Sequence, residues 1–216
     1  MAIPDLRCHI NNKNKYIFIN ISKNASTTIH NTLRFDMFSN YDAEKYRDYY
    51  KFIILRNPIN RIISSYLEII KLRSDGPFNI TKNSKWFNEP DVTKSFSMFL
   101  DFIDNNFYDS HVLPQINFLK DKNLTINDMD CVLLHEKLKD DYLELIKLNK
   151  NIETLSHLKN LQVGNNHKKK LLKEFVIGNK EIEQRVSKIY NEDTEIYNIF
   201  KNKQTYERFN CLHNHM

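Results

Sequence analysis

A lysine that is followed closely by three hydroxyl residues is the first group in the chain that could do chemistry. Lys23 precedes Ser26, Thr27 and Thr28 in the segment SKNASTT, which starts at residue 22. Unpaired backbone N–H groups in the first turn of a helix bind anions, and hydroxyl groups and a lysine beside them strengthen such a site. The segment therefore predicts a loop that holds a phosphate or sulfate group.

A second group of this kind begins at Arg56, in the segment RNP that ends at Pro58. Proline is favoured at the first position of a helix, so a helix is expected to start there. Polar residues recur at helical spacing on the side of this helix opposite the apolar stripe, and they form one polar edge that starts beside Arg56: Arg61, Ser64, Ser65 and Glu68. Arginine together with serine at this edge predicts a second phosphate site.

The two groups follow apolar runs that have the composition of buried strands. Residues 16–21 are rich in β-branched and aromatic side chains, and residues 51–55 and 131–134 are mostly apolar. Each run ends in a polar turn before a helical pattern. Strands that alternate with helices predict an α/β fold with a central parallel sheet, which binds ligands at the carboxyl ends of its strands. Helices are expected over residues 26–38, 92–105 and 180–202, and through Leu138, Tyr142, Leu145 and Ile146.

The length of 216 residues is typical of one α/β domain, so residues 1–216 are expected to form a single domain. Residues 74–92 are polar and contain Gly76, Pro77 and Pro90, which predicts a long surface excursion. The aromatic pair Trp86 and Phe87 within it could stack on a sugar ring, but we expect it to pack against the body of the protein.

The net charge of +5, from 32 Lys and Arg against 27 Asp and Glu, is too small for a nucleic-acid coat and fits a small polyanionic ligand. Three distant cysteines argue against a disulfide framework and favour the cytoplasm. No secretory signal leads the sequence, and no apolar run approaches the roughly 20 residues that span a bilayer, so a soluble protein is expected. The oligomeric state is not indicated. No metal is expected, because no zinc spacing fits Cys8, His9, Cys211, His213 and His215.

Two anion sites at the tips of two strands suggest a ligand with two separated phosphate-like groups, such as a nucleotide bisphosphate. The first loop lacks the Gly-x4-Gly-Lys-Ser/Thr pattern of a magnesium-dependent NTPase, because Lys23 precedes the hydroxyl residues and no glycine is present. An NTPase is therefore disfavoured.

The two segments resemble the 5′-phosphosulfate loop and the 3′-phosphate motif of PAPS-dependent sulfotransferases (PAPS is 3′-phosphoadenosine 5′-phosphosulfate). They are closer to the carbohydrate branch, which includes the heparan sulfate 2-O-sulfotransferase and bacterial relatives. Residues 111–115 (HVLPQ), 132–142 and 189–200 agree with that branch. The resemblance implies the P-loop-like sulfotransferase fold, PAPS as donor, adenosine 3′,5′-bisphosphate as product, a carbohydrate hydroxyl as acceptor and no metal.

The resemblance also implies roles for the residues of both motifs. Lys23 would contact the phosphosulfate bridge and stabilise charge on the departing phosphate. The 5′-phosphate would be held by Asn24, Ala25, Ser26, Thr27 and Thr28, and the 3′-phosphate by Arg56 and Ser64. The loop departs from the common family pattern, in which a proline stands at the position of Ser22 and glycines stand at those of Asn24 and Ala25.

Transfer to a hydroxyl requires a base. His111, in the family-like segment HVLPQ, is the first choice, and Glu44, Asp48 and His30 are reserves. Lys168, the first of three consecutive lysines, could reach a cofactor phosphate or could simply begin a solvated helix. Two other functions remain open: a nucleotide-dependent small-molecule kinase, and a non-catalytic nucleotide-binding protein that has lost the base.

Overall fold

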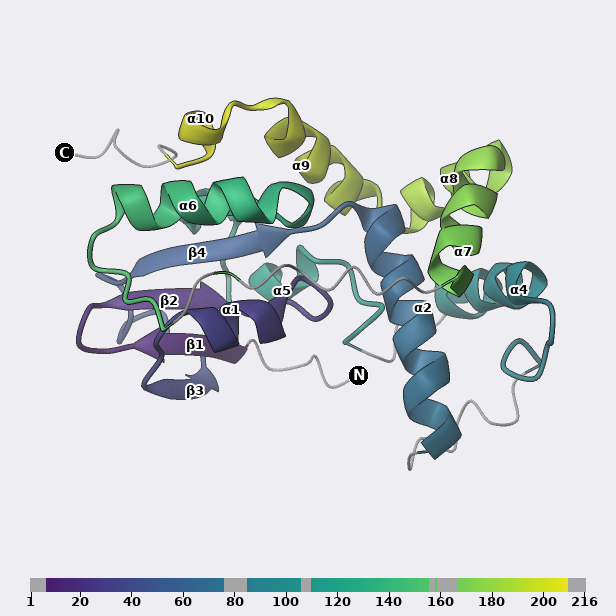
Figure 1. Cartoon of the computed structure of the whole chain (residues 1–216), viewed down its shortest axis with the longest axis horizontal. Helices are drawn as coiled ribbons and strands as arrows, with labels where there is room; N and C mark the ends of the chain where they lie inside the picture. The colour runs from purple at the N-terminus through teal and green to yellow at the C-terminus, as the bar shows by residue number, and fades with distance from the viewer. Residues whose placement is uncertain (1–6, 76–84, 106–109, 156–157, 159–166, 210–216) are drawn as a thin grey trace. The chain divides into compact units, whose positions relative to one another are not determined.

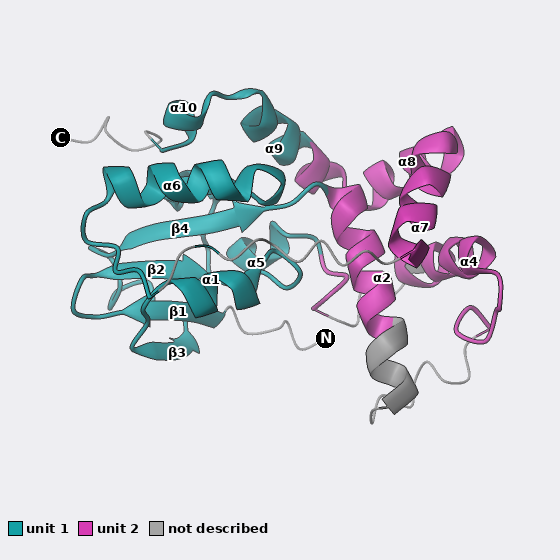
Figure 2. Ribbon diagram, in the orientation of Figure 1, with its two compact units in different colours: residues 1–57, 114–162, 195–216 teal, residues 58–113, 163–194 magenta. Residues whose placement is uncertain are grey.

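The computed structural model describes residues 7–75, 85–105, 110–155, 158 and 167–209 (Figure 1). The chain forms two compact units (Figure 2). Unit 1 contains residues 1–57, 114–162 and 195–216, and unit 2 contains residues 58–113 and 163–194. Residues 76–84 of the predicted excursion lie outside the described residues, as do Cys211, His213 and His215.

Unit 1 is built on a five-stranded sheet with the strand order β3-β1-β2-β4-β5. The predicted parallel strands form its centre and one edge, where β2 pairs with β4 and β4 pairs with β5 in parallel. Two antiparallel strands, which the sequence analysis did not identify, extend the sheet beyond β2. The strands are β1 (Arg7–Asn11), β2 (Tyr16–Ile19), β3 (Met37–Asn40), β4 (Tyr50–Leu55) and β5 (Cys131–Leu134).

The helix expected over residues 26–38 is wrong in its second half. Helix α1 spans only Ser26–Thr32, and Leu33 is extended with φ −103° and ψ 151°. Met37 and Phe38 belong to β3, whose residues pair with β1 in the register Cys8↔Ser39. Threonine and asparagine are weak helix formers, so the pairing of an exposed strand edge outweighs the helical period in this segment.

Three helices cover one face of the sheet: α1, α6 (Leu138–Leu148) and α10 (Thr205–Phe209) (Figure 1). Strand residues on this face, such as Phe18, Phe52 and Leu133, pack against Ile29 of α1 and Leu145 of α6. The alternate strand residues are also buried, which explains why the strands read as continuous apolar runs. Unit 1 also contains α5 (Asn117–Lys120), the two short helices η1 (Ile126–Asp128) and η2 (His135–Lys137), and most of α9 (Asn191–Asn202).

A buried ion pair joins α6 to α10. The side chains of Asp141 and Arg208 are both fully buried, and Nη2 of Arg208 donates to Oδ1 of Asp141. The other carboxylate oxygen of Asp141 accepts the backbone N–H of Leu134 at 2.7 Å, at the end of β5. Nε and Nη1 of Arg208 are buried and have no hydrogen-bond partner among the described residues. The pair therefore fixes α10 to the end of a central strand.

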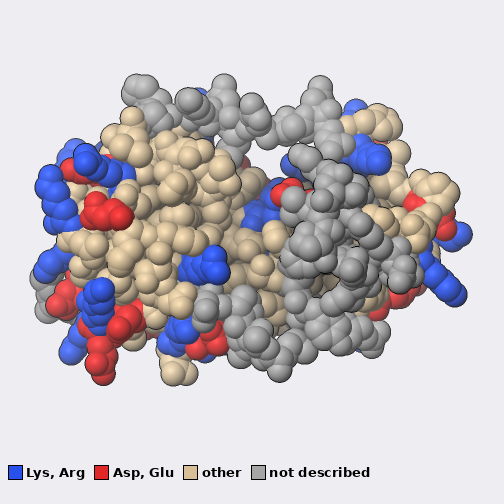
Figure 3. Space-filling model, turned by 90° about the horizontal axis from the view of Figure 1, so that it is seen from below, with Lys and Arg blue, Asp and Glu red and all other residues tan. Residues whose placement is uncertain are grey.

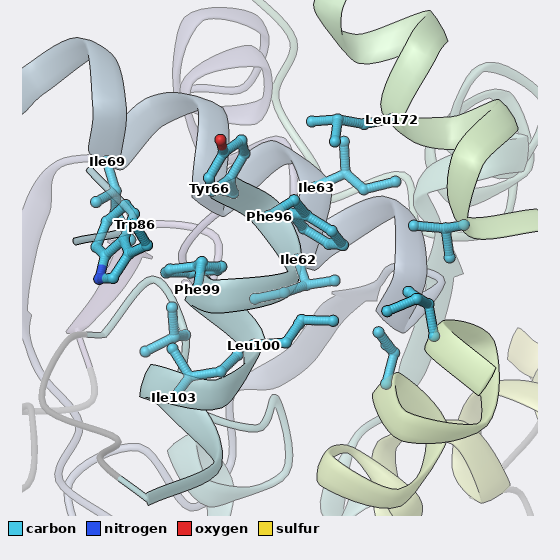
Figure 4. Packing of buried hydrophobic residues seen from close by; sticks show 14 of the residues in the cluster. Ile62, Ile63, Tyr66, Ile69, Trp86, Phe96, Phe99, Leu100, Ile103 and Leu172 are labelled. Atoms are coloured by element: carbon cyan, nitrogen blue, oxygen red, sulfur yellow. The ribbon is translucent and has the colours of Figure 1, made fainter. Parts of the chain in front are cut away.

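Unit 2 is helical. It is formed by α2 (Pro58–Asp75), α4 (Val92–Asn105), α7 (His167–Gly178) and α8 (Lys180–Ile189), so the predicted start at Pro58 and the predicted helix over 92–105 are confirmed. Residues 167–170 form the first turn of α7. The core of the unit gathers aromatic and aliphatic side chains from these helices (Figure 4).

Trp86 belongs to this core. It is 3% exposed, its ring lies 5.0 Å from that of Phe99 and 6.3 Å from that of Tyr66, and Figure 4 shows it beside Phe99. The expectation that the aromatic pair packs against the protein body is confirmed for Trp86. This tryptophan is therefore not an exposed stacking platform.

Acidic and basic side chains lie interspersed on the face of the molecule shown in Figure 3, in keeping with the small net charge of +5. Within the described ranges, no helix is both long enough and apolar enough to cross a membrane.

Candidate functional site: the tips of the parallel strands in unit 1

The loop between β2 and α1 has an unusual backbone. Lys23 and Ala25 adopt left-handed conformations with φ of 69° and 63°, although neither is a glycine. This conformation costs a non-glycine residue about 1–2 kcal/mol. Such strained residues persist only where the surrounding structure holds them, and they often occur at functional sites.

Asn24 lies between these two residues and is fully buried. Its hydrogen bonds help to keep the loop in the strained conformation. Its Nδ2 donates to the carbonyl oxygen of Ile54 at 2.7 Å and to Oε1 of Gln115 at 2.6 Å. Ile54 is in β4, the strand next to β2. A buried amide side chain thus ties the lysine loop to the neighbouring parallel strand.

Arg56 lies at the end of β4, is 5% exposed, and meets the same loop. Its Nη1 donates to the carbonyl oxygen of Lys23 at 2.7 Å. The structure therefore brings together two of the residues that the sequence analysis placed in separate motifs. They meet because parallel strands β2 and β4 are neighbours, so their carboxyl ends lie at one edge of the sheet.

The three hydroxyl residues after Lys23 differ in their surroundings. The hydroxyl of Ser26 lies within hydrogen-bonding range of Oδ1 of Asn20 and of the carbonyl oxygen of Ile21, 3.2 Å away, so it closes the loop on itself. Thr27 is exposed and Thr28 is partly exposed. Helix α1 is short, so the contribution of its dipole is smaller than the predicted longer helix would give.

Glu136 follows the third parallel strand, and the sequence analysis gave it no role in the site. Both of its carboxylate oxygens accept the backbone N–H of Asn57, at 3.3 and 3.4 Å, and Oε2 accepts the hydroxyl of Tyr197 at 3.1 Å. Burial raises the pKa of Tyr197, and the carboxylate of Glu136 raises it further. Glu136 thus fixes the turn that follows Arg56. Its position directly after a buried strand was the available signal.

In unit 2, the polar edge predicted on α2 is largely buried, which corrects the expectation that it lies opposite the packed face. Arg61 is 1% exposed and Ser65 is 0% exposed, whereas Ser64 is partly exposed. Burial lowers the pKa of Arg61, and Asp193 is the main opposing influence. Arg61 and Ser65 hold protein carbonyl groups, as described next. The role of Ser64 at a 3′-phosphate stays a prediction.

His111 lies in a segment whose backbone is held by side chains of unit 2. Four successive carbonyl groups, those of residues 110–113, accept hydrogen bonds from side chains. Arg61 donates to Ser110 at 3.4 Å and to Leu113 at 2.7 Å. Ser65 donates to His111 at 2.6 Å, and Tyr190 donates to Val112 at 2.8 Å. The side chain of His111 is half-buried.

The reserve candidates for the base lie in different surroundings. His30 is exposed at the end of α1, where its Nδ1 lies 3.3 Å from Nδ1 of His9. The ring of His9 packs against Phe18, and burial together with His30 lowers the pKa of His9 to about 4. His30 thus contacts His9 of β1, whose ring belongs to an aromatic cluster. Glu44 and Asp48 are exposed in the turns before β4.

Lys168 is exposed in the first turn of α7, in unit 2. This position agrees with the helix start that was weighed against a phosphate contact. Its contact with a cofactor stays a prediction.

No group of three or more His, Cys, Asp or Glu side chains that could hold a metal occurs within the described ranges. Cys8 and Cys131 are buried. Burial raises the pKa of Cys8 to about 12, so this cysteine is an unreactive thiol at neutral pH.

A mixed sheet that carries a lysine loop and an arginine at the tips of two neighbouring parallel strands defines an α/β protein. The family model described as the Sulfotransferase family matches residues 7–201, and the chain belongs to this family. Its α/β fold is the one expected for a sulfotransferase. No curated protein and no solved structure gave a match.

Proposed function

We propose that this sulfotransferase moves a sulfuryl group from PAPS to a hydroxyl of a carbohydrate. The observation that carries the proposal is the junction of Lys23 and Arg56 at the tips of β2 and β4. It brings the guanidinium of Arg56 to the backbone of Lys23 at one edge of the sheet, where a donor with a phosphosulfate and a second phosphate would bind. The carbohydrate acceptor rests on the resemblance of residues 111–115, 132–142 and 189–200 to the carbohydrate branch.

In the proposed reaction, the acceptor oxygen attacks the sulfur of PAPS while its proton passes to a base. The bond between sulfur and the bridging oxygen of the 5′-phosphate breaks in line, and adenosine 3′,5′-bisphosphate leaves with the electron pair. Such a transfer is achieved by positioning and by stabilisation of the developing charge. Lys23 would stabilise charge on the bridging oxygen, the loop from Asn24 to Thr28 would hold the 5′-phosphate, and Arg56 with Ser64 would hold the 3′-phosphate.

His111 is the proposed base. Its support is the fixed backbone of residues 110–113, because a base must be held in place relative to the proton that it removes. We expect His111→Gln to lower kcat by about 10²–10⁴-fold, the usual contribution of a general base, with little change in the affinity for adenosine 3′,5′-bisphosphate. Steady-state kinetics and calorimetry separate the two effects. Glu44→Gln, at an exposed reserve position, is the control. If it abolished transfer while His111→Gln did not, the base would have to be reassigned.

Binding of the product nucleotide without metal tests the proposed function. Adenosine 3′,5′-bisphosphate is expected to raise the melting temperature in the presence of EDTA, since a ligand that binds only the folded state stabilises it. Transfer of radioactive sulfur from PAPS is then measured with a panel of glycans, peptides and small alcohols. Stabilisation only by Mg-ATP would favour a kinase instead. Binding of the bisphosphate without transfer to any acceptor would favour a non-catalytic nucleotide-binding protein.

The cytoplasmic location, the single-domain description of residues 1–216 and the absence of nucleic-acid binding remain predictions that belong to this proposal.

A further inference from the structure

Gln115, the last residue of the segment HVLPQ, makes hydrogen bonds to both the lysine loop and the end of strand β4. The sequence analysis gave this residue no role. Its side chain is 1% exposed. Oε1 accepts the backbone N–H of Arg56 at 2.9 Å, and Nε2 donates to the carbonyl oxygen of Arg56 at 2.9 Å. Both backbone groups of Arg56 are therefore paired with one side-chain amide, which continues the hydrogen bonding of the sheet beyond the end of β4.

The same Oε1 atom also accepts from Nδ2 of Asn24 at 2.6 Å. Asn24 is the residue between the two left-handed positions, Lys23 and Ala25. One glutamine thus connects the backbone at Arg56 with the strained part of the lysine loop. The guanidinium of Arg56 also donates to the carbonyl oxygen of Lys23, so Arg56 is bonded to the lysine loop directly as well as through Gln115.

We infer that Gln115 is a positioning residue for the donor site. Together with Asn24 it forms an amide clamp, defined here as the hydrogen bonds of these two side chains to each other, to Ile54 and to Arg56. The clamp holds a loop without glycine in a backbone conformation that glycine would adopt without strain. The inference rests on the proposed function for its ligand, but the conformation of the loop does not depend on that ligand.

The physical reason for the clamp is the balance of free energies in the loop. A left-handed conformation costs free energy for any residue other than glycine. A buried hydrogen bond stabilises the folded form, and a buried polar group that loses its partner destabilises it more strongly. The hydrogen bonds of the clamp therefore oppose the strain of the loop.

Gln115→Met tests the clamp, because methionine has a similar size and lacks the amide. Hydrogen exchange of the amides of residues 22–25 in the unliganded protein is expected to become at least about tenfold faster, the equivalent of one or two lost hydrogen bonds. The Kd for adenosine 3′,5′-bisphosphate is expected to rise by a similar factor. Because the exchange measurement needs no nucleotide, it remains informative if the wild-type protein does not bind the bisphosphate and the proposed function fails.

Asn11→Leu is the matched control. Asn11 is another buried amide in unit 1, 1% exposed, and its Nδ2 donates to Tyr16 and to the carbonyl oxygen of Arg34. It pairs with Tyr16 at the start of β2, the end of the strand opposite the loop. This variant should lower the melting temperature without changing exchange at residues 22–25 or the affinity for the bisphosphate.

Ala25→Gly in the Gln115→Met background tests the role of strain. Glycine removes the penalty of the left-handed conformation at this position, so it is expected to recover about threefold or more of the lost affinity. The inference would be overturned if Gln115→Met left loop exchange and affinity at their wild-type values, or if Asn11→Leu changed both equally. Failure of Ala25→Gly to recover any affinity would overturn the explanation through strain.

Discussion

Lys23→Ala is expected to lower kcat for sulfuryl transfer by about 10²–10³-fold or more, the usual effect of removing one group that stabilises developing charge. The reason is the negative charge that builds on the bridging oxygen as the S–O bond breaks. The unfolding free energy should change little, by about 0.5 kcal/mol or less, because the side chain is partly exposed and alanine can keep the same backbone strain.

The measurement compares initial rates with radioactive PAPS, using the acceptor identified by the panel, and chemical denaturation of the same samples. Lys23→Arg retains the charge and should retain part of the activity. Lys45→Ala removes an exposed lysine elsewhere in unit 1 and should leave the rate unchanged. Full activity in Lys23→Ala would show that Lys23 does not stabilise the charge on the bridging oxygen, and the proposed mechanism would be wrong at this residue.

Asp141→Asn is expected to give the largest loss of stability, about 3–5 kcal/mol, because it removes one partner of a buried ion pair and leaves a charge without its counterion. Arg208 would remain fully buried, with the N–H groups that already lack partners in the described part of the chain. Denaturation monitored by circular dichroism measures the loss.

Two comparisons make this prediction specific. The double variant Asp141→Leu with Arg208→Met removes both charges and should be more stable than Asp141→Asn, since replacing a buried pair by apolar groups is often neutral or stabilising. Lys13→Met removes an exposed ion pair with Glu153, in which the lysine side chain is 77% exposed, and should cost less than about 1 kcal/mol. Equal losses of unfolding free energy in Asp141→Asn and Lys13→Met would contradict the prediction, because the buried pair would then contribute no more to stability than an exposed one.

The parallel strands could be predicted from the sequence because both of their faces are buried. Such strands appear as continuous apolar runs, and the runs at 16–21, 51–55 and 131–134 correspond to β2, β4 and β5. The start of α2 at Pro58 could also be predicted from the sequence, because proline has a fixed φ and no N–H to donate and is therefore favoured at the first position of a helix. The lysine loop and Arg56 followed from their places at the ends of these strands.

The antiparallel strands β1 and β3 were not predicted, and residues 33–38 were assigned to a helix. Ile29, Leu33 and Met37 fit a helical period, but pairing with β1 is a long-range interaction that no local pattern reports. The burial of Arg61 was missed for a similar reason. Its carbonyl partners, Ser110 and Leu113, lie about fifty positions away in the chain.

The sequence by itself determined which residues stand at the strand tips, because strand periodicity and the turn residues that end each strand are local properties. Only the tertiary structure decided that Arg56 contacts the backbone of Lys23 and that Asn24 and Gln115 support them both. The physical reason is that a loop without glycine cannot hold left-handed residues through local interactions alone. Its conformation depends on hydrogen bonds from the side chain of Asn24 to the backbone carbonyl of Ile54 and to the side chain of Gln115, which lie 30 and 91 positions away and come close only when the sheet has formed.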